Sequence, residues 1–243
     1  MGERARLCEP AGMDFVRIMQ VKDKGIGLLA ALCLMWTLLI TAGEAVLYGM
    51  PGYFEREYTK YAVTERVPIG MDALLGVTDE MMEYLRTDGA ELSVFAEIDG
   101  QEREFFNEKE KRHMRDVRQL FLDALRLRLL ALAIFMVCAA HLLGKGQKDT
   151  LLRMLQWGIG GILAALVALA LLISTNFTRY FTVFHLLLFD NDDWLLNPKT
   201  DLLINIVPEG FFRDTALLIA AVFVGSAALI WLIAAALRKR AGQ

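Results

Sequence analysis

Two histidines in the chain have neighbours that suit acid–base chemistry. His113 is followed three residues later by Asp116, and a carboxylate at that spacing on a helix can orient or charge an imidazole. His185 lies in an aromatic run and precedes the acidic segment 190–193. An imidazole has an unperturbed pKa of about 6.5, so it can accept or donate a proton near neutral pH. Both segments are therefore candidates for general acid–base catalysis.

Each histidine also has a structural interpretation. Positions 113, 117, 120 and 124 share one helical face, so His113 borders the buried side of its helix. His185 has the surroundings of an aromatic belt at a membrane surface. The acidic segment after it fits a solvated turn and lacks the glycine and distal glutamate of a calcium loop. His141, near the end of an apolar stretch, is interpreted as an interfacial residue.

The elements that must position these residues are long and apolar. Hydrophobic residues make up 56% of the chain, and the mean hydropathy of +0.40 argues against an ordinary soluble domain. A helix crosses a bilayer core with about 20 consecutive apolar residues. We predict an all-α membrane protein with four transmembrane helices and a small mixed α/β extracellular cap. The predicted spans are residues 25–48, 127–143, 155–173 and 216–237.

The first span is predicted to be permanent and not a cleaved signal peptide. Its apolar core is longer than the roughly 7–15 residues of a signal peptide. Glu44 interrupts the nearest pattern of small residues that could be a cleavage site. Leu32 before Cys33 does not match a lipoprotein cleavage site.

Basic residues near the span ends predict the orientation in the membrane. Lys22 and Lys24 precede the first span, Lys145 and Lys148 lie between the second and third, and residues 238–240 follow the fourth. Both termini are therefore expected in the cytoplasm. The predicted cytoplasmic segments are residues 1–24, 144–154 and 238–243, and the predicted extracellular segments are residues 49–126 and 174–215.

The long extracellular segment is predicted to be a folded cap. Apolar spacing favours a helix over residues 54–62. Thr78 is placed to cap a second short helix that ends near Leu85. About 70 residues make a thin core, so the cap is expected to depend on the membrane surface or the second extracellular segment.

The second half of this segment predicts a hairpin followed by a long helix. Residues 92–106 have the pattern of two strands that turn at Asp99-Gly100 in a type I′ turn. Asn107 and Glu110 form a capping pair for the next helix. No glycine or proline interrupts the chain from there to Leu143, so the helix is expected to continue directly into the second span.

Cysteine usage and charge exclude several classes of protein. Cys8, Cys33 and Cys138 lie outside both predicted extracellular segments, so no disulfide is expected there. Their spacing resembles neither a zinc site nor a redox pair. The net charge of −3, with no basic stripe or aromatic platform, indicates no nucleic-acid partner. We predict neither a metal nor a cofactor.

Several stretches around the two histidines form recognisable motifs. They are Asn107-Glu108-Lys109-Glu110, His113-Met114-Arg115-Asp116-Val117, Phe184-His185, Phe189-Asp190-Asn191-Asp192-Asp193-Trp194, Asp201-Leu202-Leu203-Ile204 and Pro208-Glu209-Gly210-Phe211-Phe212. These motifs resemble those of the lipoprotein intramolecular transacylase (Lit) family. The resemblance extends over most of the chain but leaves about the first 20 residues unmatched, and residues 50–100 match only in general character.

The resemblance implies a fold, a reaction and partners. Lit proteins have four spans in the plasma membrane of Gram-positive bacteria, with an extracellular cap between the first and second. They move the sn-2 acyl chain of a diacylglyceryl lipoprotein to the α-amino group of its N-terminal cysteine, which gives a lyso-form lipoprotein. The two catalytic histidines of the family carry over onto His113 and His185. The implied partners are this lipoprotein and membrane lipid, and no oligomeric state is implied.

Such a reaction suits two imidazoles without a metal. The α-amine has an unperturbed pKa of about 7.7–8.0, so a neutral imidazole can remove its proton during attack on the ester. An imidazolium can then protonate the departing glyceryl oxygen. We favour His185 as the first base. A shaped pocket must also hold the amine near the ester. Such proximity lowers the activation barrier by roughly several kcal/mol in intramolecular reactions.

Aromatic residues near the histidines are candidates for the lining of that pocket, although each also fits an interfacial belt or the cap core. They are Phe105, Phe106, Phe181, Phe184, Trp194, Phe211 and Phe212. Candidates to orient the imidazoles are Asp116, Asp190 and Asp192. Glu44, near the outer end of the first span, is a further candidate to face the pocket.

Two other classes of function stay open. The first is a membrane hydrolase whose metal is held by His113, His185 and an extracellular aspartate, although metal sites usually need more ligands than this histidine count readily supplies. The second is a membrane scaffold in which both histidines are structural. Transport is disfavoured because the third and fourth spans carry no charge that would mark a polar pathway.

Overall fold

The computed structural model describes residues 10–98 and 100–241, with side chains over 19–98 and 100–240. Within them the chain divides into two compact units. Cys8, the predicted turn residue Asp99 and residues 242–243 lie outside the described residues. The helical unit comprises residues 10–39, 128–168 and 223–241, and the cap unit comprises residues 40–127 and 169–222.

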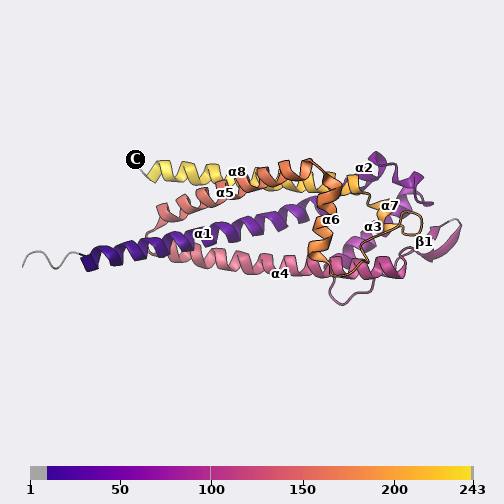
Figure 1. The fold of residues 1–243 in the computed structure, drawn as a ribbon, viewed down its shortest axis with the longest axis horizontal. Coiled ribbons are helices and arrows are strands. Elements are labelled where there is room, and N and C mark those ends of the chain that lie inside the picture. Colours follow the sequence, from indigo (N-terminus) through magenta and orange to yellow (C-terminus); the bar gives the residue numbers. More distant parts are fainter. Residues whose placement is uncertain (1–9, 99, 242–243) are drawn as a thin grey trace, which may run out of the picture. The chain divides into compact units, whose positions relative to one another are not determined.

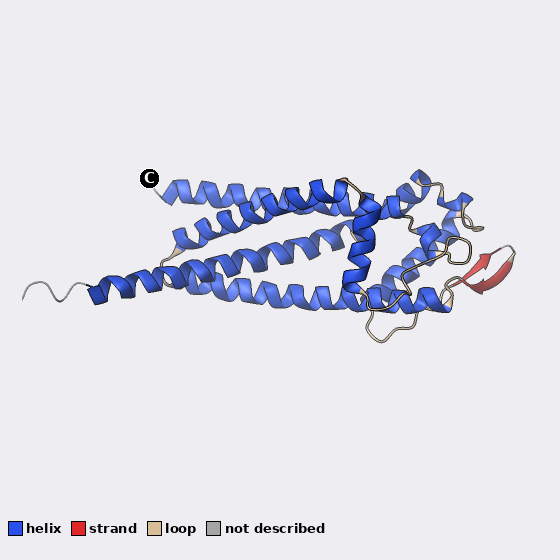
Figure 2. Ribbon diagram, in the orientation of Figure 1, coloured by secondary structure: helices blue, strands red, loops and turns tan. Residues whose placement is uncertain are grey.

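Long helices make up most of the described chain (Figures 1 and 2). Four of them are long and apolar enough to cross a membrane. One of these continues unbroken from its polar first turns into its apolar stretch, as the lack of glycine and proline predicts. The predicted fold class, a mostly helical membrane protein with a small sheet, is confirmed. The four helices are α1 (Pro10–Leu47), α4 (Glu108–Gly144), α5 (Lys148–Ser174) and α8 (Glu209–Ala241).

Small residues permit close packing inside the helical unit. Ala30 and Ala31 on α1 are fully buried, and a Cβ atom at Gly158 of α5 would collide with Ala31. Gly27 approaches the side chain of Met154 in the same way. Close approach of backbones is a main source of helix association in lipid, where burial of apolar surface contributes little.

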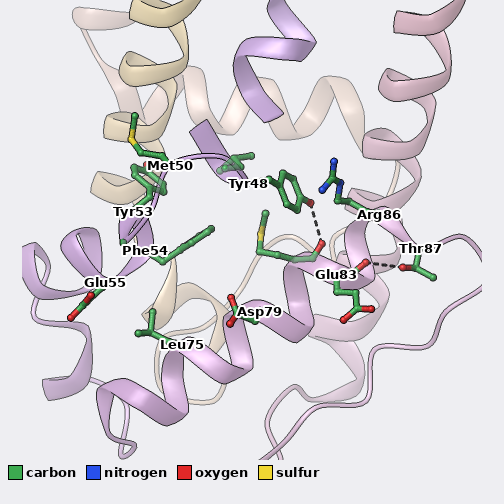
Figure 3. Close-up of a pocket in the computed structure, with 13 residues that line it drawn as sticks. Tyr48, Met50, Tyr53, Phe54, Glu55, Leu75, Asp79, Glu83, Arg86 and Thr87 are labelled. Carbon is green, nitrogen blue, oxygen red and sulfur yellow. Dashed lines mark hydrogen bonds between the residues drawn. The ribbon is translucent and has the colours of Figure 1, made fainter. Parts of the chain in front are cut away.

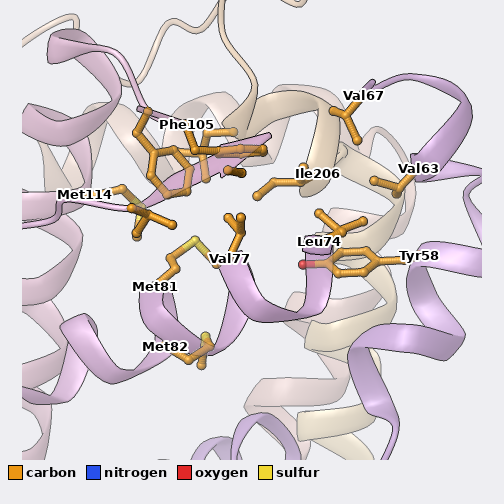
Figure 4. Packing of buried hydrophobic residues seen from close by; sticks show 14 of the residues in the cluster. Tyr58, Val63, Val67, Leu74, Val77, Met81, Met82, Phe105, Met114 and Ile206 are labelled. Atoms are coloured by element: carbon orange, nitrogen blue, oxygen red, sulfur yellow. The ribbon is translucent and has the colours of Figure 1, made fainter. Parts of the chain in front are cut away.

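The cap unit is built around α3 (Met71–Arg86), whose apolar face lies at the centre of the main core (Figure 4). Leu74, Val77 and Met81 recur at helical spacing and are at most 5% exposed. The predicted helix near residues 54–62 is confirmed as α2. The other elements of this unit are α2 (Tyr53–Lys60), the 3-10 helix η1 (Val63–Glu65), the strands β1 (Phe95–Ile98) and β2 (Gln101–Glu104), α6 (Phe177–Leu188) and α7 (Leu203–Ile206), with the adjoining turns of α1, α4, α5 and α8.

The predicted helix start at Thr78 is wrong. Thr78 lies in the middle of α3, which begins at Met71. Its hydroxyl donates to the carbonyl oxygen of Leu74 at 2.8 Å and lies 2.7 Å from the hydroxyl of Tyr58. A threonine can satisfy its hydroxyl by bonding four residues back inside a helix, so a local capping signal does not define a helix start when apolar spacing continues through it.

The predicted hairpin is present as an antiparallel pair of strands. β1 and β2 pair with Ile98 opposite Gln101. Gly100 adopts a φ of +76°, which glycine tolerates without steric cost. Ala96 and Ile98 face the core, whereas the other residues of β1 are exposed. The hairpin therefore adds one face to the cap core.

Candidate active site

His113 lies near the start of α4, in a helix whose first turn is capped. The Oδ1 atom of Asn107 accepts hydrogen bonds from the backbone N–H groups of Lys109 (2.9 Å) and Glu110 (3.1 Å). The backbone N–H of Asn107 donates in return to Oε2 of Glu110 at 2.7 Å. This is the predicted capping pair. His113 follows one turn later beside buried Met114 and is only 8% exposed, which confirms that it borders the buried face.

His185 lies on the last turns of α6. This helix is capped by Asn176, whose Oδ1 atom accepts a hydrogen bond from the backbone N–H of Arg179 at 3.0 Å. The Nδ1 atom of His185 lies 2.7 Å from the carbonyl oxygen of Phe181. Because a carbonyl oxygen only accepts, Nδ1 carries the hydrogen in this contact. Nε2 therefore keeps its lone pair and is the nitrogen that can act as a base.

The cap unit brings the two imidazoles together from distant parts of the sequence. The ring centroids of His113 and His185 are 6.2 Å apart. Phe189 contacts both rings, with centroid distances of 5.1 and 5.7 Å. Trp194 stacks on the ring of His185 at 4.9 Å, and Phe181 meets the same ring edge-on at 4.4 Å. The histidine pair is thus held in an aromatic surrounding.

The two imidazoles differ in their hydrogen bonding. Within residues 19–98 and 100–240, the Nδ1 atom of His113 is buried without a hydrogen-bond partner. Burial, and then the nearby ring of His185, lowers the pKa of His113 to about 4. A charged imidazole would need an acceptor for each N–H group, and the buried Nδ1 has none. His113, in the polar turns ahead of the apolar part of α4, is therefore neutral at pH 7.

Both imidazoles line a cavity of about 330 Å³, here called the histidine cavity. Its volume lies near the lower end of the roughly 300–1,000 Å³ that ligand cavities occupy. Apart from the histidines, its polar side chains are Trp194 and Thr215, and the rest of the lining is apolar. Such a cavity suits a ligand that combines hydrocarbon with a reactive polar group.

The aromatic residues proposed for the lining occupy three kinds of position. Phe105 and Phe106 meet edge-on at 5.0 Å and are at most 2% exposed, because they pack in the core around α3 and not in the cavity lining. Phe184 is 51% exposed and meets the ring of His185 edge-on at 5.4 Å from outside the lining. Those that line the histidine cavity are Phe181, Trp194, Phe211 and Phe212.

The carboxylates proposed to orient the imidazoles have other positions. Asp116 accepts a hydrogen bond from Nδ2 of Asn191 at 2.9 Å. Asp190 and Asp192 are exposed. In the described part of the chain none of the three forms a hydrogen bond to either imidazole. For the second histidine the physical reason is local, since the carbonyl of Phe181 one turn earlier already occupies Nδ1.

Glu44 also lies away from the histidine cavity. Its carboxylate pairs with Arg86 at 2.9 Å, and the guanidinium of Arg86 lies 4.0 Å from the centre of the Tyr48 ring. Among residues 19–98 and 100–240, no group of three or more histidine, cysteine or acidic side chains is arranged to hold a metal ion.

Two buried carboxylates form hydrogen bonds to distant segments that were not predicted from the sequence. Glu110, 1% exposed, accepts a hydrogen bond from the backbone N–H of Leu203 at 2.6 Å, besides the one from Asn107. Asp201, 4% exposed, accepts from the backbone N–H of Asn197 at 2.7 Å and from Nδ2 of Asn107 at 2.9 Å. They fasten the start of α4 to the segment after α6. The signal that could have found them is their place in the recognisable motifs without an evident role in the reaction.

An ion pair makes a third connection between the same segments. The guanidinium of Arg112 donates to both carboxylate oxygens of Asp193, at 2.9 and 2.8 Å. These hydrogen bonds hold the pKa of Asp193 below its usual value. Because Trp194 follows directly and stacks on His185, the pair helps to set the position of that indole.

These features define a class of protein, a helical membrane protein with an imidazole pair in an apolar cavity. A model of the family described as lipoprotein intramolecular transacylase Lit matches residues 28–212. The chain therefore belongs to the Lit family and is a membrane acyltransferase. Comparison with curated proteins finds no match.

Solved structures with a similar fold come from Bacillus cereus. The in meso structure of the membrane integral lipoprotein intramolecular transacylase Lit has a TM-score of 0.75 and 24% identity, over 90% of this chain and 97% of that chain. A variant with one histidine replaced by arginine has a TM-score of 0.75 and 24% identity, over 96% and 100% of the two chains. The corresponding alanine variant has a TM-score of 0.74 and 24% identity, over 93% of this chain and 97% of that chain. At this identity the likeness shows a shared fold.

Proposed function

We propose that this transacylase moves the sn-2 acyl chain of a diacylglyceryl lipoprotein to the α-amino group of the N-terminal cysteine. The product is a lyso-form lipoprotein. The observation that carries the proposal is the pair of imidazoles, from two separate segments, that line one apolar cavity. The apolar lining suits hydrocarbon chains, and two imidazoles in one cavity are suited to proton transfer between an amine and an ester oxygen.

His185 acts as the base in this proposal. Its Nε2 atom removes a proton from the α-amine as the nitrogen attacks the carbonyl carbon of the sn-2 ester. The imidazolium that forms keeps its Nδ1–H bond to the carbonyl oxygen of Phe181. The new C–N bond forms and the C–O bond to glycerol then breaks. The same proton passes to the departing glyceryl oxygen, so no atom is gained or lost.

His113 stabilises charge in this proposal and does not carry it. With its pKa lowered to about 4 it stays neutral at pH 7, and a neutral imidazole can donate one hydrogen bond. In this proposal Nε2 carries the hydrogen and donates it to the oxyanion of the tetrahedral intermediate, while the buried Nδ1 keeps its lone pair. Other enzymes use a neutral histidine as an electrophile in this way.

The proposed topology places both termini in the cytoplasm and the cap unit outside, with spans near residues 25–48, 127–143, 155–173 and 216–237. The basic residues at the span ends support this orientation. In this topology exported lipoproteins reach the histidine cavity at the extracellular surface of the plasma membrane, where membrane lipid surrounds the substrate. Single cysteines introduced into the cap unit test this topology, by labelling with an impermeant maleimide in intact cells. Protection of every such cysteine from the label contradicts the proposed topology.

Mass spectrometry of a purified diacylglyceryl lipopeptide incubated with the protein tests the reaction. We expect an unchanged total mass and a fragment ion that places one acyl chain on the α-nitrogen. The product should carry a free hydroxyl at the sn-2 carbon. Release of free fatty acid would show hydrolysis, and an unmodified lipopeptide would show no transfer; either result contradicts the proposal.

A further inference from the structure

The cap unit holds a second cavity, and Figure 3 shows the side chains that line it. It has a volume of about 630 Å³ and lies among the end of α1, α2 and α3. Leu47, Phe54 and Met82 line both cavities, so these side chains form a common wall. The ring of Phe54 also stacks on Phe211 of the histidine cavity, with centroids 5.9 Å apart. The two cavities are therefore neighbours in the cap unit.

One face of α3 supplies much of the lining. Leu75, Asp79, Glu83 and Arg86 follow the three- and four-residue spacing of a helical face, and all four line the cavity. Glu55 of α2 also lines it. Figure 3 shows Asp79 and Glu83 on successive turns of α3. We call this space the acidic cavity.

Negative charge in the acidic cavity is not neutralised by the protein. In the described part of the chain the carboxylates of Glu55, Asp79 and Glu83 form no ion pair, although all three line the cavity. The guanidinium of Arg86 is committed to Glu44 at 2.9 Å and to the Tyr48 ring. All three carboxylates are exposed, so they are open to a cationic side chain of a bound ligand.

The substrate of the proposed function has two unlike parts that meet at the reacting cysteine. Its acyl chains are hydrocarbon, whereas its polypeptide carries N–H and C=O groups that need hydrogen-bond partners. The apolar histidine cavity offers few such partners, and burial of unpaired peptide groups would be costly. The neighbouring acidic cavity is polar and shares the side chains of Leu47, Phe54 and Met82 with it.

We propose that the acidic cavity binds the polypeptide segment that directly follows the lipidated cysteine, and that it favours a lysine or arginine there. This inference rests on the proposed function and adds a substrate preference to it. The apolar wall formed by Leu47, Phe54 and Met82 packs against the first residues after the cysteine. Asp79 and Glu83 then pair with a basic side chain of that segment.

Lipopeptides that differ in one position test this preference. Three diacylglyceryl lipopeptides carry lysine, glutamine or glutamate at the second or third residue after the cysteine. Transfer to nitrogen is followed by mass spectrometry in one neutral detergent. We expect kcat/KM to be roughly three- to tenfold higher for lysine than for glutamate, the range for one or two partly exposed ion pairs.

Asp79→Lys should abolish or reverse this ratio. Glu80→Lys is the matched control, because Glu80 is exposed on the same helix, undergoes the same charge change and is outside the lining of the acidic cavity. The control should keep the wild-type ratio. Acyl transfer to the nitrogen of the glutamine lipopeptide by the Asp79→Lys protein shows that this variant is folded. If Asp79→Lys does not fold, Glu83→Lys is tested instead.

Several outcomes overturn the inference. Values of kcat/KM for the lysine and glutamate lipopeptides that agree within twofold would contradict the proposed preference, while the transacylase function would still stand. An equal loss of preference in Glu80→Lys would assign the effect to overall charge. A rate that depends on added anionic or cationic lipid but not on the peptide would assign the cavity to a lipid headgroup. Absence of transfer from every lipopeptide would instead contradict the proposed function itself.

Discussion

His113 and His185 are almost equally buried, yet they are held in different ways. The Nδ1 atom of His185 donates to the carbonyl of Phe181, so its proton position is defined within its own helix. The Nδ1 atom of His113 is buried without a partner, and its pKa falls to about 4. The proposed function therefore gives the role of base to His185 and a neutral role to His113.

The difference teaches that burial alone does not assign a role to a histidine. Exposure values of 8% and 6% would give the two rings the same description. The hydrogen bond at the second nitrogen separates them, because it decides whether the protonated ring can be satisfied. Three predictions test this comparison, beginning with the largest expected effect.

His185→Gln removes the proposed base and should have the largest effect. We expect the rate of acyl transfer to fall roughly 10²- to 10⁴-fold, the usual contribution of a general base. The measurement is single-turnover transfer on a lipopeptide. His141→Gln is the control, because His141 is exposed at the far end of α4, and it should keep the wild-type rate. A His185→Gln rate within threefold of wild type would remove His185 from the chemistry.

His113→Gln should have a smaller effect, because glutamine retains an N–H donor. Removal of an oxyanion donor typically costs about 10²- to 10³-fold, and we expect a loss below that range. The pH profile gives the sharper test. Since the pKa of His113 is lowered to about 4, the wild-type ring is already neutral at every pH above about 5. The midpoint of the acid limb of kcat/KM should therefore be unchanged in the variant, and a shift of about one pH unit would assign that limb to His113.

The lowered pKa of His113 also has a consequence for stability. The unfolded chain binds a proton on this ring at a pKa of about 6.5, whereas the folded protein does so only near 4. Above about pH 6.5 the ring is neutral in both states and has no effect on the free energy of unfolding. As the pH drops from there toward 4, only the unfolded chain binds the proton, so the folded protein loses stability. His113→Gln should lessen this fall in the unfolding temperature, measured in detergent against His141→Gln. An equal fall in both variants would contradict the buried neutral ring.

Glu110→Gln should have the smallest effect on the reaction and act through stability. The carboxylate accepts backbone hydrogen bonds from Asn107 and Leu203, and an amide can present an oxygen to only one of them. A buried donor left unpaired costs about 1–3 kcal/mol. We expect a lower unfolding temperature with only a modest loss of transfer at low temperature. Exposed Glu108 is the matched control, and an equal change in Glu108→Gln would exclude the proposed fastening role.

Local signals predicted the start of α4 correctly. The Asn107 and Glu110 capping pair and the burial of His113 follow from residues within a few turns of one another, and the unbroken helix follows from the lack of glycine and proline as far as Leu143. The same kind of reasoning failed at Thr78, because a hydroxyl can be satisfied inside a helix as well as at its end. Spacing in the sequence also favoured Asp116 as an orienting group, but its carboxylate binds Asn191.

The sequence by itself determined the long apolar helices, the capped turn that carries His113 and the family to which the chain belongs. Those features depend on composition and on contacts between near neighbours. Only the tertiary structure decided how far apart the two imidazoles lie, which nitrogen of each is occupied, and that Asp79 and Glu83 line a cavity beside theirs. The physical reason is that each of these depends on packing between segments distant in the chain, or on one choice among competing hydrogen-bond partners, and no local pattern encodes either.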